Sequence, residues 1–417
     1  MKSTSRVLLA LVLAMLLGIG VSALGNPQLL AAVDFLAPIG SLWVNAIRMT
    51  VIPLVVSLII TGLGSAGDMQ SLGTVGRRTL LVFFGLLTFV AAIAVPLAPI
   101  AFGALPSNGG VHPALPPGAA EVTSEIAKAG PVQSVGAWVN SLLPTNPIAA
   151  AANGALMQLV LFTILFSLAL TRVESATRTQ LVEVFRGIGD TMQVLVGAVI
   201  ALAPIGVFAL VVPLAAHTGS AFAGAVGYYV VVYSGFSLGI TLLFYPLAKA
   251  FGGIPFRRFA KAAVPVQLIG ISSASSVASL PALIDSADRE LELPSQASGF
   301  VLPLAVSTLK VAAPMTWAVG ACFIGWFYGV PLGFRELATI AFAGVFLSFA
   351  APGVPNGAFL LLTPLFVQIG LPAEGIGILI ALDAIPDRVA TVLNVTGDLT
   401  AAAIIVGGKT RTRTDAA

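Results

Sequence analysis

Charged side chains are scarce in this sequence, at 9% of 417 residues, whereas soluble globular proteins average about a quarter. A single cysteine, Cys322, excludes an internal disulfide and any CxxC metal or redox motif. Only two histidines, His112 and His217, are present, so the chain has no His/Cys cluster of the kind that binds zinc. Basic residues form no block interleaved with aromatic side chains, and nucleic acid is therefore not an expected partner.

Apolar residues take the place of the missing charge: they make up 58% of the chain, and the mean hydropathy is +1.02. They form many continuous runs of about 20 residues, each long enough to cross a hydrocarbon core about 30 Å thick. The runs are continuous rather than alternating with a period of two, which excludes a transmembrane β-barrel. The sequence therefore predicts an all-α polytopic protein whose constant partner is the lipid bilayer.

Eight through-going helices are expected, the first of them uncleaved. Their ranges are 7–24, 41–63, 79–102, 135–170, 192–216, 224–251, 298–328 and 375–406. The fourth is broken by PTNP at 144–147, and the seventh is interrupted at Lys310 and Pro314. Two further segments, 260–293 and 337–369, have middles rich in Gly, Ser and Pro, which favours re-entrant hairpins.

The basic residues predict the orientation. Most of the 20 Lys and Arg residues fall in loops on one side of this layout, and only Lys128 and Arg335 fall in loops on the other. By the positive-inside rule, the N- and C-termini are expected in the cytoplasm and the protein in the inner membrane.

Few ionisable residues remain within the apolar segments, and each costs roughly 2.5–3.5 kcal/mol there, which makes it a functional candidate. They are Arg48, Lys310, Asp383, Asp387, Arg388 and Asp398. Arg48 lies near the start of its segment and is expected to snorkel to the membrane interface.

The last segment carries polar residues at spacings that place them on one helical stripe, namely Asp383, Asp387, Thr391, Asn394 and Asp398. Its carboxylates repel one another unless a cation, an ammonium group or protons intervene. A structural alternative pairs them with Arg388 and Lys310 in internal salt bridges.

The first hairpin contains SSASSVASLP, with Ser275 and Ser276 at its centre, and the second contains SFAAPGVPNG, with Val354 and Pro355. Half-helices that begin at such tips can direct their positive N-terminal ends at a substrate carboxylate. The alternative for the serines is ordinary small-residue packing between helices. Paired broken segments of this kind are typical of the binding site of a secondary transporter.

These segments together resemble the dicarboxylate/amino acid:cation symporter family. The matching stretches run in order from RMTVIPLVVSLIITGL near Arg48 through PTNP, AANG, APIGVFAL, the serine-rich hairpin and PGVP to NVTGDLT, and cover nearly the whole chain. The resemblance implies a glutamate-transporter-like elevator fold of eight transmembrane helices plus two re-entrant hairpins. It also implies a homotrimer, in which a mobile transport domain slides against a static scaffold.

The same resemblance divides the chain into five parts. They are 1–78, scaffold helices 1 and 2; 79–134, transport-domain helix 3 and an outer linker; 135–223, scaffold helices 4 and 5 with the trimer contacts; 224–408, the transport domain with helix 6, the first hairpin, helix 7, the second hairpin and helix 8; and 409–417, a cytoplasmic basic tail.

The resemblance also assigns substrate residues. An aspartate at the position of Asp387 holds the substrate amino group, Asn394 contacts the substrate carboxylate, and dicarboxylate carriers generally lack that aspartate. Carriers of acidic amino acids have an arginine at the position of Ala390, whereas neutral amino acid exchangers lose it. The complete expected set is Ser275, Ser276, Val354, Pro355, Asp387, Arg388, Ala390, Thr391 and Asn394.

The cation sites depart from the family pattern. The family's Asn-Met-Asp-Gly-Thr motif aligns with the residues 309–313, which read LKVAA, while Phe83 and Phe84 replace a tyrosine and Ala351 a threonine. Sodium requires several oxygen ligands, so sodium dependence is doubtful, and coupling to protons is an alternative. The expected coupling residues are Lys310, Asp383 and Asp398, and a residual sodium site at Asp398 and Asn394 stays open. Lys310 either replaces a bound sodium as a tethered cation or merely neutralises Asp398.

The sequence thus predicts a secondary transporter of small, neutral amino acids, without a cofactor, with sodium coupling weak or absent. One alternative is a cation- or proton-coupled symporter of dicarboxylates or acidic amino acids, in which Arg388 binds a carboxylate. A remote alternative is an intramembrane hydrolase that pairs a hairpin serine with Lys310 as its base.

Overall fold

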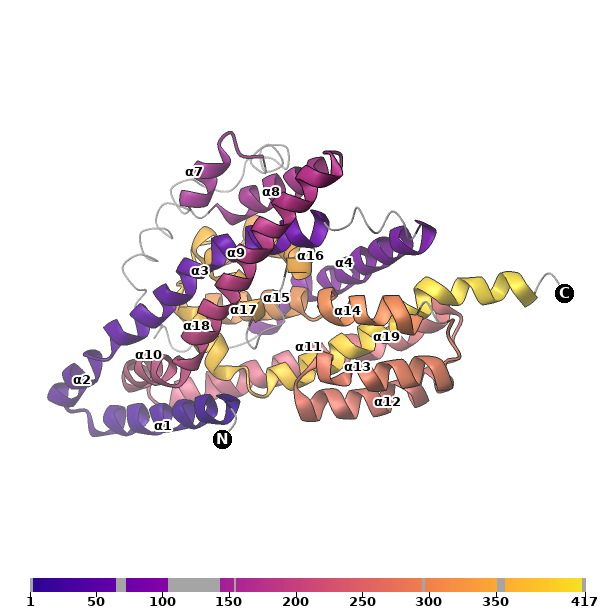
Figure 1. The fold of residues 1–417 in the computed structure, drawn as a ribbon. Coiled ribbons are helices and arrows are strands. Elements are labelled where there is room, and N and C mark those ends of the chain that lie inside the picture. Colours follow the sequence, from indigo (N-terminus) through magenta and orange to yellow (C-terminus); the bar gives the residue numbers. More distant parts are fainter. Residues whose placement is uncertain are drawn as a thin grey trace.

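The computed structural model describes residues 3–64, 73–103, 143–153, 155–294, 297–350 and 357–414. Within these ranges the regular structure is helical, with no strand (Figure 1). Four features expected from the sequence lie outside the described residues: most of the outer linker, Ala351, Val354 and Pro355.

One group of helices comes mainly from the first half of the chain. It comprises α1 (Ser3–Leu24), α2 (Pro27–Asp34), α3 (Ala37–Gly64), α7 (Pro147–Ala152), α8 (Leu156–Leu170), α9 (Ser175–Ala201) and α10 (Ala203–Thr218). Helix α1 packs along α10, and α3 packs against α8, α9 and α10 (Figure 1). Helix α3 is therefore the centre of this group.

The second group comprises α4 (Gly73–Gly103), α11 (Ser220–Gly252), α12 (Phe256–Ser273), α13 (Ser276–Asp285), α14 (Leu302–Thr308), α15 (Ala313–Tyr328), α16 (Phe334–Phe346), α17 (Gly357–Gln368), α18 (Glu374–Leu382) and α19 (Pro386–Thr414). Helix α19 packs against α4, α11, α12 and α14, and α15 packs against α4 and α16. Helices α17 and α18 also contact α3, so the two groups meet there.

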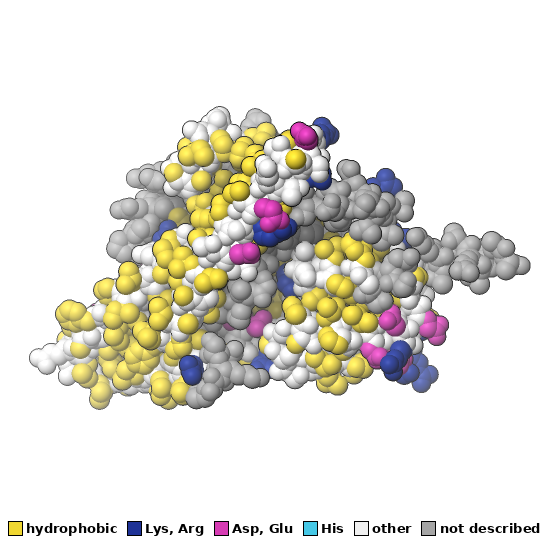
Figure 2. Space-filling view, in the orientation of Figure 1, with side chains coloured by type: hydrophobic (Ala, Val, Ile, Leu, Met, Phe, Trp, Pro, Cys, Tyr) yellow, Lys and Arg dark blue, Asp and Glu magenta, His cyan; other side chains and the backbone are white. Residues whose placement is uncertain are grey.

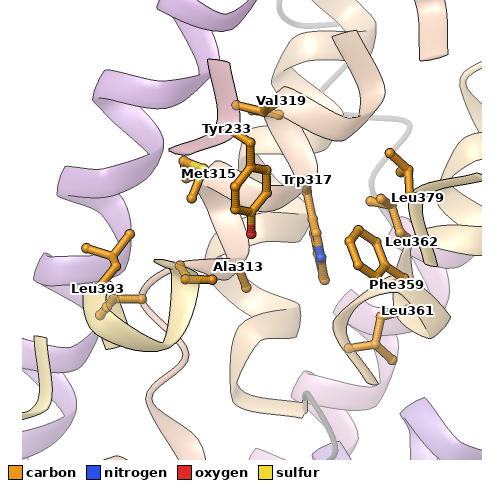
Figure 3. Close-up of a cluster of buried hydrophobic side chains, with 14 of the residues drawn as sticks. Tyr233, Ala313, Met315, Trp317, Val319, Phe359, Leu361, Leu362, Leu379 and Leu393 are labelled. Atoms are coloured by element: carbon orange, nitrogen blue, oxygen red, sulfur yellow. The ribbon is translucent and has the colours of Figure 1, made fainter. Parts of the chain in front are cut away.

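Helix α15 forms the centre of the core, since each of its residues except Trp326 is buried. Trp317 of α15 lies between Tyr233 of α11 and Phe359 of α17 in Figure 3. Elsewhere large apolar side chains face outward, among them Leu16 at 66% exposure and Val194 at 77%. Figure 2 shows such side chains over the α1–α3 side of the molecule, the surface composition expected of a protein whose solvent is lipid.

Seven helical stretches in the described part of the chain are long and apolar enough to cross a membrane. They overlap the expected helices 1, 2, 3, 5, 6, 7 and 8, of which the fifth and eighth are covered only in part. The expected fourth helix is represented by α8, a shorter apolar helix, and part of its predicted range is outside the description. The prediction of an all-α polytopic membrane protein is confirmed.

Two predictions of single helices are wrong, in each case because of a proline. The span predicted over 192–216 is two helices, α9 and α10, with Pro204 in the first turn of α10. The span predicted over 375–406 is also two helices, separated by residues 383–385, and α19 begins at Pro386. Proline lacks the N–H that a continuous helix would require, but it is accommodated in a first turn.

The predicted interruption at Lys310 and Pro314 is confirmed, because residues 309–312 separate α14 from α15 and are not helical. PTNP also marks a helix start: the Asn146 side chain accepts hydrogen bonds from the amides of Ile148 and Ala149 and caps α7.

Candidate functional site

The tip of the first hairpin is a tight reversal between α12 and α13. Ala274 adopts a left-handed conformation with φ 52°, and Ser275 caps α13 by accepting a hydrogen bond from the Ala278 amide at 3.2 Å. Ser276, the first residue of α13, is buried. The first N–H groups of a helix have no intrahelical partners, so the tip presents donors and a partial positive charge.

Helix α19 starts beside this tip. The Arg388 guanidinium donates hydrogen bonds to the carbonyls of Ile271 and Ser272, at 2.8 and 3.0 Å, in the last turn of α12. A cation is favourable there, because the carbonyls at a helix C-terminus carry partial negative charge. Among the described residues Arg388 forms no ion pair with a carboxylate, so the predicted structural salt bridge of this residue is absent from that part of the chain.

Asp387, the neighbour of Arg388, is half-buried in the first turn of α19. Asp383 is buried at the end of α18 and therefore does not share one continuous helix with Asp387, contrary to the predicted stripe. The two remain close because the Asp387 amide donates to the Asp383 carbonyl at 2.8 Å. Ala390 and Thr391 are both buried, and the Thr391 hydroxyl donates to the Asp387 carbonyl.

Asn394 joins α19 to the interruption between α14 and α15. Its Oδ1 accepts a hydrogen bond from the Ala312 amide at 2.9 Å. Nearby, a Cβ on Gly397 would lie 2.5 Å from Cγ2 of Val311, so only glycine allows α19 to approach so closely. The interruption is therefore held against α19 at two points. The side-chain nitrogen of Asn394, Nδ2, can still donate a hydrogen bond to another group.

Lys310 and Asp398 lie at this junction. The Lys310 ammonium donates to the Val306 carbonyl at 2.7 Å, at the open end of α14. Asp398 is fully buried, and neither of its carboxylate oxygens has a hydrogen-bond partner among the described residues. The two charges attract each other without forming a direct ion pair.

The residues expected to bind sodium do not provide its ligands. Leu309 and Val311 are fully buried apolar side chains, and Phe83 and Phe84 pack in the core, the latter with its ring 5.4 Å from that of Phe346. In the part of the chain that the structure describes, no group of three or more His, Cys, Asp or Glu could hold a metal ion. Asp398 is the one acidic group left at the junction of α14, α15 and α19 within the described ranges.

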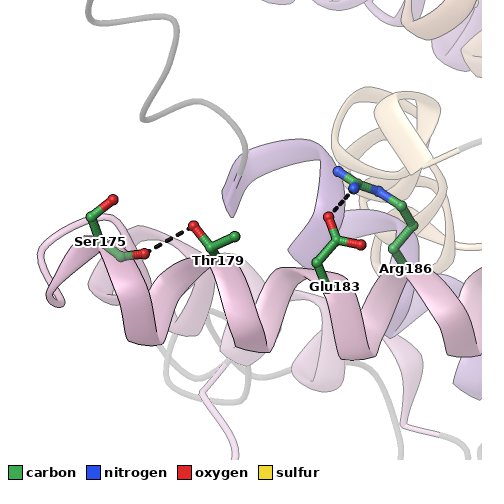
Figure 4. Close-up of polar contacts among 4 residues, drawn as sticks. All are labelled: Ser175, Thr179, Glu183 and Arg186. Carbon is green, nitrogen blue, oxygen red and sulfur yellow. Dashed lines mark hydrogen bonds and ion pairs between the residues drawn. The ribbon is translucent and has the colours of Figure 1, made fainter.

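Arg48 lies in a pocket formed by other helices than those of the hairpin tip and the interruption. It is exposed and lines a pocket of about 240 Å³ between α3, α7 and α17, with Asn153 as the other polar side chain. Helix α9 carries local polar contacts, Thr179 to the Ser175 carbonyl and Arg186 to Glu183, which stabilise its exposed first half (Figure 4).

Two contacts tie α19 to the predicted elements: Arg388 binds the end of α12 beside the hairpin tip, and Asn394 binds the interruption that carries Lys310. Sequence reasoning missed the Ala312 amide and the Ser237 hydroxyl, which donates to the Val389 carbonyl at 2.9 Å. Backbone groups and a serine in an apolar helix give no distinguishing signal in a sequence.

An interrupted helix, a hairpin tip and charged residues converge here within a helical membrane protein. Irregular backbone at membrane depth is tolerated where protein or a watery cavity satisfies its polar groups, and this arrangement defines a secondary transporter. The chain belongs to the Sodium:dicarboxylate symporter family, whose sequence model matches residues 4–407.

Similar characterised proteins are transporters. The chain is 27% identical to a proton/glutamate-aspartate symporter of Escherichia coli (strain K12) over 96% of this chain and 91% of that protein. It is 29% identical to a proton/sodium-glutamate symport protein of Bacillus subtilis (strain 168), over 93% and 88%. It is 27% identical to the neutral amino acid transporter B(0) of Bos taurus, over 95% and 78%. The predicted family resemblance is confirmed, and the protein is a transporter rather than an enzyme, which removes the hydrolase alternative.

Proposed function

We propose that this protein is a secondary transporter of small, neutral amino acids. The proposal is supported by a difference between two neighbouring charged residues, Asp387 and Arg388, in their hydrogen bonds. Arg388 is bound to the carbonyls of the first hairpin, whereas the Asp387 carboxylate accepts no hydrogen bond from the described residues. The Asp387 carboxylate is therefore available to a substrate ammonium, while one nitrogen of the Arg388 guanidinium is engaged by the hairpin.

The substrate carboxylate has complementary groups on both sides of Asp387. The N-terminus of α13 offers backbone donors at Ser276, and Asn394 retains its amide nitrogen as a donor. A zwitterion matches this pattern of one anionic site flanked by donors. A dicarboxylate would place a second negative charge near Asp387, which is unfavourable.

Ala390 supports the neutral character of the substrate. Its buried methyl group offers no charge and no donor, so nothing at this position can hold a side-chain carboxylate. The expected neighbours Val354 and Pro355 are apolar as well.

The transport cycle that we propose is an elevator. Helices α1–α3 and α7–α10 would form the static scaffold, with the trimer contacts in 135–223, and α4 with α11–α19 would form the moving domain. We place the protein in the inner membrane with both termini in the cytoplasm. The basic residues at the open end of the first hairpin support this orientation: Arg258 pairs with Glu292 and Lys261 with Glu290, at 3.0 and 2.8 Å. Sodium coupling is weak or absent, and protons are the alternative coupling ion.

A second candidate is transport of acidic amino acids or dicarboxylates, which the names of two similar bacterial proteins favour. A thermal-shift panel separates the two, because a ligand stabilises the native protein according to its affinity. The purified protein is heated with neutral amino acids, with aspartate and glutamate, and with succinate, each in sodium and in choline buffer. Stabilisation by neutral amino acids alone supports the proposal, and stabilisation by succinate or glutamate alone contradicts it.

A further inference from the structure

Asp398 has a buried carboxylate without a hydrogen-bond partner among the described residues. It lies in the middle of α19 with an exposed fraction of 0%, and neither oxygen receives a hydrogen bond from the described residues. An ionised carboxylate without compensation is strongly disfavoured in such surroundings. The position is therefore stable only when a proton or a nearby positive charge neutralises the carboxylate.

The charge within reach is that of Lys310. This residue lies in the non-helical segment that Asn394 holds against α19, and its ammonium attracts both Asp398 and Asp387. Arg388 is bound to the first hairpin and is ten positions away from Asp398 along α19. In the structure the Lys310 ammonium donates to the Val306 carbonyl at the end of α14. A lysine has a flexible four-carbon stem and three donors, so it can move from this carbonyl to a nearby carboxylate.

The junction offers an inorganic cation few side-chain ligands. The segment between α14 and α15 contributes Leu309, Val311 and Ala312, which have no side-chain oxygen, and Oδ1 of Asn394 already accepts the Ala312 amide. Sodium or calcium prefers several oxygen ligands, and here it would also face an ammonium of like charge.

We propose that Lys310 is a cation built into the protein that binds Asp398 when the substrate site is occupied and makes an inorganic coupling cation unnecessary. This inference rests on the proposed transport function and concerns the coupling of the same site. In the substrate-free state the ammonium stays on the Val306 carbonyl. When substrate occupies Asp387 and Asn394, the ammonium passes from the Val306 carbonyl to Asp398.

The experiment compares wild-type protein with Lys310→Met, which matches the length of lysine without charge, and with Lys310→Arg as the charged control. The double variant Lys310→Met/Asp398→Asn removes both charges. Thermal unfolding without substrate and the dissociation constant for the best-stabilising amino acid are measured in sodium, potassium and choline buffers.

We expect the dissociation constants of the wild type in the three buffers to agree within about twofold. A twofold difference in a dissociation constant corresponds to only about 0.4 kcal/mol of binding free energy. Lys310→Met should bind substrate at least tenfold more weakly, because Asp398 is left unpaired in the occupied state. Lys310→Arg should bind substrate nearly as the wild type does, and the double variant should recover most of the wild-type affinity.

Two results would overturn the inference. The first is a steep rise of wild-type stability or affinity with sodium concentration, which requires no variant to fold. The second is unchanged binding by Lys310→Met in choline, or no recovery in the double variant. Substrate-free unfolding is measured without any amino acid. If no amino acid binds, the unfolding temperature in sodium and in choline still shows whether an inorganic cation binds, so failure of the proposed substrate can be told apart from failure of the inference.

Discussion

Arg388 of α19 donates a hydrogen bond to the Ile271 carbonyl, the last turn of the first half of the hairpin, at 2.8 Å. The bond ties the start of α19 to the tip that presents the α13 N-terminus. It also neutralises the partial negative charge of the α12 carbonyls, so that the adjacent Asp387 keeps its own charge for a ligand. The charge balance of the site thus favours an ammonium group.

Asp387→Asn should abolish amino acid binding without loss of folded protein. Removing one partner of a desolvated charge pair costs about 2–5 kcal/mol, or at least about 30-fold in affinity. Uptake into proteoliposomes and thermal unfolding are measured together. Asp190→Asn on the exposed face of α9 is the matched control and should behave as wild type. Uptake that survives Asp387→Asn contradicts the ammonium site.

Ala390→Arg should shift the preference towards aspartate and glutamate. A guanidinium at this buried position would pair bidentately with a side-chain carboxylate and would be unpaired with a neutral substrate. Competition for uptake by aspartate and by serine measures the shift. Ala390→Met supplies similar bulk without charge, and an equal gain for aspartate in that variant would show that charge is not the cause.

Arg388→Met should weaken substrate binding about tenfold while the preference for neutral amino acids persists, since the hairpin tip loses its attachment to α19. Arg388→Lys should bind substrate with an affinity between those of the wild type and Arg388→Met, because lysine keeps the charge but lacks the planar, pre-organised donors of arginine. The measurement is the dissociation constant of each variant for neutral amino acids and for aspartate and glutamate. A variant that loses only acidic ligands would instead make Arg388 a substrate ligand.

Gly397→Ala should destabilise the protein by about 1–3 kcal/mol, because its Cβ would overlap Val311 in a packed core. The unfolding temperature is the measurement. Gly235→Ala on α11, where a Cβ meets nothing within 4 Å, is the control and should be neutral. Adding Val311→Ala to Gly397→Ala should restore part of the loss; if it does not, the close approach at this junction is not the cause.

The order of helices and the interruption at Lys310 could be predicted, because apolar run length and local proline or glycine content act over a few residues. The breaks before Pro204 and Pro386 were missed, since hydropathy averages over a proline that begins a helix. The bond from Ala312 to Asn394 and the unpaired state of Asp398 could not be predicted. They depend on how α19 lies against the interruption, which is set by the packing of the whole chain.

The central claim is that a neutral amino acid is bound and carried without sodium. The most direct test is uptake of labelled alanine and serine into proteoliposomes in which choline replaces sodium on both sides, with labelled succinate in parallel. The account predicts saturable amino acid uptake at the rate seen in sodium, lost in Asp387→Asn, and no uptake of succinate. Uptake that requires a sodium gradient, or that carries succinate but neither amino acid, would contradict it.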